Sequence, residues 1–138
     1  MRRFLYLCAV LSIGLPAFGL EPLPKDLPHC DLAGPPNDAK SFELPHGNEF
    51  KLHPVAPGLS YTGCVWLWTN SDTQLVTLFE RGQPKYYRDV NGGRRPAVVE
   101  CSYEGSTLLK RVATPAEYPR RCPNPEELRD LYLNSRDK

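Results

Sequence analysis

The sequence has no marked excess of charge of either sign, and after residue 19 it has no apolar run long enough to cross a membrane. Its 138 residues include 17 Lys and Arg against 16 Asp and Glu. A near-neutral chain creates no overall field that would attract nucleic acid or an anionic membrane surface. A membrane-spanning helix needs about 20 apolar residues. We therefore expect no nucleic-acid partner and no integral membrane segment in the mature protein.

Sequence motifs for metal binding and catalysis are also absent. No Cys-x-x-Cys or Cys–His pair occurs at the spacing of a zinc site. No serine occupies a nucleophile elbow. The histidines His29, His46 and His53 lie in proline-rich sequence, where we expect surface loops. The sequence therefore predicts no metal site, no cofactor and no catalytic residue.

The first nineteen residues have the pattern of a secretory signal. Arg2 and Arg3 precede an apolar run over 4–15, and the small residues Ala17 and Gly19 stand at the two positions that a signal peptidase recognises. We expect 1–19 to be cleaved, which leaves 20–138 as one mature domain. Export predicts a periplasmic location, with an extracellular location as the alternative.

The cysteine content agrees with export. Cys8 lies in the expected signal, and the mature chain keeps four cysteines, an even number that indicates two disulfides in an exported protein. Four cysteines allow three connectivities. The sequential pairing is preferred: a bond between Cys101 and Cys122 would close a loop of about 20 residues. It leaves Cys30 with Cys64, which would fasten the N-terminal segment to the first core strand.

The mature chain divides by composition into three parts. Residues 20–60 are rich in proline and are expected to form an irregular arm, with short edge strands near 41–44 and 49–52. Residues 61–122 are expected to form a β core, because short apolar runs alternate there with turn residues. We predict a mainly β fold, either a small antiparallel sheet or a sandwich.

A short helix and tail are expected over 123–138. Asn124 is a typical N-cap, and Pro125 suits the first helical position. Leu128, Leu131 and Tyr132 fall on one helical stripe.

A hairpin centred on 91–93 is the strongest candidate for a functional surface. Its Asn-Gly pair favours a tight turn. Tyrosine and arginine flank this turn, and both are favoured at binding hot spots. The alternative is that the tyrosines pack in the core. The predicted partner-binding residues are Tyr86, Tyr87, Arg88, Arg94 and Arg95.

Two carboxylate pairs could be proposed for hydrolysis, Asp31 with Asp38 and Glu100 with Glu104. A sequence does not give the distance within either pair. Successive side chains of a strand point to opposite faces, and the neighbours of Glu100 on its strand are predicted to face the core. Glu100 is therefore expected to project into solvent.

The second half of the chain resembles a family of small exported proteobacterial proteins of unknown function. The similarity spans roughly 75–122 and rests on Val76–Thr77–Leu78–Phe79, Gly82–Gln83–Pro84, Cys101–Ser102–Tyr103–Glu104–Gly105–Ser106, Leu109, Arg111 and Cys122. The shared pattern is Cys-x-Tyr-x-Gly-Thr/Ser followed by a final Cys. Some proteins of this kind resemble periplasmic immunity proteins that neutralise cell-wall-attacking effectors, so the resemblance implies a protein partner.

Three functional hypotheses follow from these observations. The first is a non-catalytic binding protein, a periplasmic inhibitor or immunity protein that occludes a cell-wall enzyme. The second is an envelope hydrolase that uses a carboxylate pair. The third is a structural envelope component, which should show an exposed edge strand and self-association.

Overall fold

The described chain consists of seven strands followed by one helix. The computed structural model describes residues 23–32, 34, 36–43, 49–55, 57–69 and 73–133. The expected signal peptide and Cys8 lie outside these residues. The elements are β1 (Lys40–Glu43), β2 (Glu49–His53), β3 (Gly63–Thr69), β4 (Thr73–Glu80), β5 (Gln83–Asn91), β6 (Ala97–Glu104), β7 (Thr107–Thr114) and α1 (Pro125–Tyr132).

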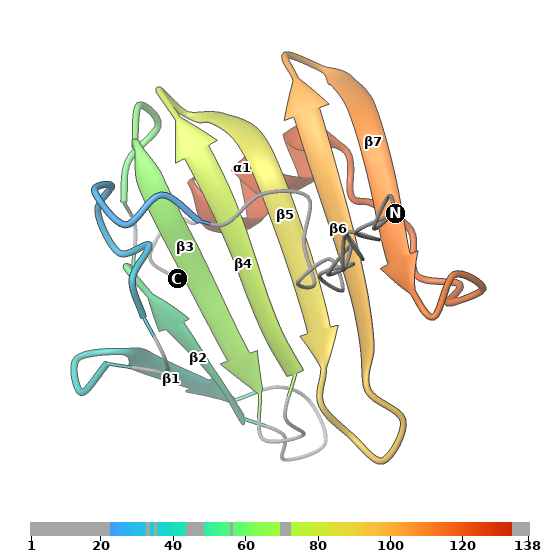
Figure 1. Cartoon of the computed structure of the whole chain (residues 1–138). Coiled ribbons are helices and arrows are strands. Elements are labelled where there is room, and N and C mark those ends of the chain that lie inside the picture. Colours follow the sequence, from blue (N-terminus) through green and yellow to red (C-terminus); the bar gives the residue numbers. More distant parts are fainter. Residues whose placement is uncertain are drawn as a thin grey trace, which may run out of the picture.

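All seven strands form one antiparallel sheet, in which neighbours in sequence are neighbours in space (Figure 1). The β4–β5 connection shows how local chemistry favours this order. Arg81 and Gly82 both have positive φ angles, +51° and +76°, as a two-residue hairpin turn requires. A Cβ on Gly82 would lie 1.9 Å from the carbonyl oxygen of Leu59. The mainly β prediction is confirmed, and the architecture is a single sheet.

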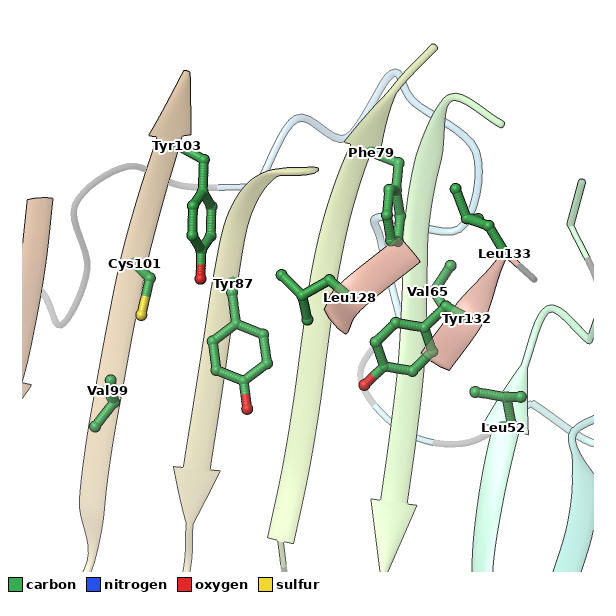
Figure 2. Packing of buried hydrophobic residues seen from close by; sticks show 10 residues of the cluster. All are labelled: Leu52, Val65, Phe79, Tyr87, Val99, Cys101, Tyr103, Leu128, Tyr132 and Leu133. Atoms are coloured by element: carbon green, nitrogen blue, oxygen red, sulfur yellow. The ribbon is translucent and has the colours of Figure 1, made fainter. Parts of the chain in front are cut away.

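Helix α1 covers one face of the sheet, called here the helix face (Figure 1). Leu128 and Tyr132 project from α1 into a cluster of buried strand residues that includes Val65, Phe79 and Tyr87 (Figure 2). The rings of Phe79 and Tyr132 meet edge to face, with centroids 6.3 Å apart. This cluster is the larger part of the core.

The N-terminal arm packs on the opposite face, called here the outer face. Leu23, Leu27 and Leu32 contact a second buried cluster that contains Trp66 and Trp68. The indole N–H of Trp66 donates to the carbonyl of His29. The arm also contributes β1 and β2 to the sheet, near the two expected positions. β1 is an edge strand as expected, whereas β2 pairs with both β1 and β3 and is therefore an interior strand.

The two disulfides pair the cysteines in sequential order, as predicted. Cys30–Cys64 joins the arm to β3, and Cys101–Cys122 joins β6 to the segment that leads to α1. Disulfides of this kind are typical of proteins that fold outside the cytoplasm. Among the described residues, no helix is long and apolar enough to cross a membrane.

Helix α1 begins where the sequence predicts it. The side chain of Asn124 accepts a hydrogen bond from the Glu127 N–H at 2.9 Å, and Pro125 follows the cap. Of the three residues on the apolar stripe, Leu128 and Tyr132 are buried, whereas Leu131 is 55% exposed. Eight residues make only about two turns, so the buried side of the helix is narrow and Leu131 falls outside it.

Candidate functional site

The β5–β6 hairpin places the predicted partner-binding tyrosines inside the molecule. Tyr86 pairs with Ser102, and Tyr87 pairs with Cys101, so the two rings point to opposite faces of the sheet. Tyr86 is 6% exposed and Tyr87 is 4% exposed. Both lie in the strand rather than at the hairpin tip. The structure therefore corresponds to the alternative in which the tyrosines pack in the core.

Tyr86 belongs to a polar cluster on the outer face together with Arg88 and Glu100. Its hydroxyl donates to Glu100 Oε1 at 2.5 Å, and Arg88 lies directly opposite Glu100 across the strand pair. The expectation that Glu100 faces solvent was wrong, because it is 2% exposed. Burial, followed by the hydrogen bond to Glu100, raises the pKa of Tyr86, so the phenol remains a donor at neutral pH.

Tyr87 belongs to a second polar cluster on the helix face. Burial raises the pKa of the neighbouring Asp89 carboxyl, and the charge of Arg120 opposes this effect. Arg120 Nε lies 2.9 Å from Asp89 Oδ2. Nearby, the guanidinium of Arg111 donates to the carbonyls of Tyr118 and Arg120. These contacts fix the segment between β7 and α1 to the sheet, so we assign them a structural role.

Arg94 and Arg95 lie apart from both clusters, in the loop between β5 and β6. All five residues of this loop, 92–96, are exposed. The expected tight turn is replaced by this longer loop, because Asn91 pairs with Ala97 and so belongs to the strand. The Asn91 side chain accepts a hydrogen bond from the Gly93 N–H at 3.2 Å, which fixes the start of the loop. Within the described chain, neither arginine forms an ion pair with a carboxylate.

A histidine pair joins the arm to β2, and the sequence did not indicate it. His53 Nε2 lies 2.9 Å from His29 Nδ1, and His53 Nδ1 lies 3.6 Å from Asp38 Oδ1. His53 was expected in a surface loop but is 7% exposed near the end of β2. Burial, followed by the neighbouring His29, lowers the pKa of His53, whereas Asp38 opposes this effect. In the part of the chain that the structure describes, no three His, Cys, Asp or Glu side chains form a group that could hold a metal ion.

The carboxylate pair on β6 does not have the geometry of a glycosidase. Glu100 and Glu104 are four residues apart on one strand, which corresponds to about 13 Å. Paired catalytic carboxylates of glycosidases are separated by about 5–9.5 Å. Glu100 is also buried under its hydrogen bond from Tyr86, whereas Glu104 is exposed at the strand end. This pair therefore provides no support for hydrolysis.

Comparison of the chain with protein-family models, curated proteins and solved structures gives no match.

Proposed function

We propose that the protein is an exported, non-catalytic binding protein, a periplasmic inhibitor or immunity protein that occludes a cell-wall-attacking enzyme. The observation that carries this proposal is the exposed loop 92–96, which presents Arg94 and Arg95 at the end of an anchored hairpin. Arginine is the cation most favoured at binding hot spots, and its planar guanidinium pairs well with carboxylates. Enzymes that cleave cell-wall glycans commonly carry paired carboxylates in their clefts.

The scaffold supports the loop from both faces of the sheet. Val99 and Cys101 hold β6 in the helix-face core, and the disulfide to Cys122 fixes the same strand. On β5, Tyr86 donates to the buried Glu100. A loop on a rigid hairpin loses little conformational freedom when it enters a cleft, which favours affinity.

The test is inhibition of purified peptidoglycan-cleaving enzymes, beginning with a muramidase whose cleft is acidic. The double variant Arg94→Glu with Arg95→Glu should weaken inhibition by about two orders of magnitude, because like charges would then face the cleft. Thermal unfolding should hardly change, since both side chains are exposed.

A second double variant controls for the change in net charge. Lys51→Glu with Arg81→Glu alters the net charge equally, at exposed positions on β2 and in the β4–β5 turn. This control should inhibit as the unmodified protein does. Unchanged inhibition by the Arg94/Arg95 variant, with folding intact, would exclude the loop as the binding site.

A further inference from the structure

Strand β7 forms a long edge of the sheet. Within the described chain, no strand pairs with the side of β7 that points away from β6. Strand β7 is the last strand of the sheet, and six of its eight residues are exposed. Leu108 is 45% exposed and Leu109 is 58% exposed. An edge strand presents unpaired backbone N–H and C=O groups that another extended segment can use.

A hollow of about 390 Å³ opens on the outer face next to this edge. One cross-strand row contributes much of its lining, because Leu78 pairs with Tyr86, Tyr86 with Ser102, and Ser102 with Lys110. Lys85 and Leu109 also contribute to the lining. The hollow therefore combines two lysines with apolar walls at the side of the sheet where β7 is exposed.

The charges that line the hollow favour an acidic partner segment. None of the side chains that line the hollow is acidic. The nearby Glu100 is buried and accepts the hydrogen bond from Tyr86. Within the described chain Lys110 has no carboxylate partner, whereas Arg111 is already engaged with backbone carbonyls.

The same charges disfavour a second copy of this chain as the occupant. Strand β7 contains Lys110 and Arg111 and no acidic residue, so pairing two copies would bring like charges together.

We propose that the edge of β7 and the adjoining hollow receive an extended acidic segment of a partner protein. The segment adds to the sheet as a further strand beside β7 and directs a carboxylate toward Lys85 and Lys110. Its apolar side chains on the other face meet Leu108, which is paired with Tyr103 and so lies toward the helix face. This surface is separate from loop 92–96, because Ser102 lies five residues along β6 from Ala97 (about 17 Å). It does not rest on the function proposed above.

The probe for this site is an eight-residue peptide of alternating valine and glutamate, tested on the oxidised mature protein by calorimetry and amide hydrogen exchange. It should bind and slow exchange in β7. The same peptide with lysine in place of glutamate should bind at least several-fold more weakly. A glutamate peptide that is N-methylated at every residue should not bind, because it lacks the main-chain N–H donors that strand pairing requires on either edge.

Variants of the protein locate the peptide. Lys110→Glu should weaken peptide binding by about fivefold, because an opposite-charge pair becomes a like-charge pair. Lys51→Glu, an exposed lysine on β2, is the matched control and should leave the affinity unchanged. Absence of peptide binding, equal binding of the N-methylated peptide, or self-association of the protein through β7 would each overturn the proposal. Arg94 and Arg95 are intact in Lys110→Glu, so this outcome is independent of the inhibition test.

Discussion

Leu128 of α1 provides the sharpest test of how the helix is held on the sheet. It is 1% exposed and packs in the helix-face cluster with Tyr87 and Tyr132 (Figure 2). Replacing a buried leucine by alanine removes apolar burial and leaves a cavity, at a cost of 2–5 kcal/mol in typical cores. We expect Leu128→Ala to lower the free energy of unfolding by about 3 kcal/mol. For a domain of this size, that corresponds to a fall in Tm of roughly 10 °C.

The same helix offers a matched control in Leu131, which is 55% exposed. Leu131→Ala makes the same chemical change at an exposed helical position and should alter stability by no more than about 0.5 kcal/mol. Both variants would be unfolded in urea with the disulfides intact, and equal m-values would show that the two transitions are comparable. An equal loss of stability in both variants would refute the described orientation of α1.

Three further predictions concern groups fixed by the fold. Because the pKa of His53 is lowered in the folded state, the unfolded chain binds more protons than the folded chain near pH 6.5. The free energy of unfolding should therefore fall as the pH drops below about 6.5. In urea unfolding at several pH values, His53→Gln should make this pH dependence weaker. Replacing Cys101 and Cys122 by alanine should cost about 3 kcal/mol of stability, and a loss near zero in chemical unfolding would contradict the cross-link. Tyr86→Phe should cost about 2 kcal/mol, measured the same way, because the buried Glu100 loses the hydrogen bond that it accepts from Tyr86.

Features encoded by neighbouring residues could be predicted from the sequence. Turn residues separated the strands of the core, and the Asn124 cap located the start of α1. The disulfide pairing was also predicted, because Cys101 alternates with Val99 and Tyr103 on a strand that must face the core.

Features that depend on cross-strand register and on covering layers could not be predicted. Alternation places Glu100 away from the helix face, but only the register shows that Arg88 lies opposite it and that Tyr86 reaches it. The contact between His29 and His53 joins positions 24 residues apart, and no local pattern indicates it. Of the predicted partner-binding residues, the two tyrosines are buried and Arg88 is half-buried, so only Arg94 and Arg95 are exposed.

The release of reducing ends from purified cell-wall sacculi distinguishes an inhibitor from a hydrolase. The mature oxidised protein would be added alone, and then together with a muramidase at increasing molar ratios. We expect no release by the protein alone and a fall in muramidase activity that reaches completion near one protein per enzyme. Release of reducing ends by the protein alone would contradict a non-catalytic role, particularly if Asp31→Asn or Asp38→Asn abolished that release.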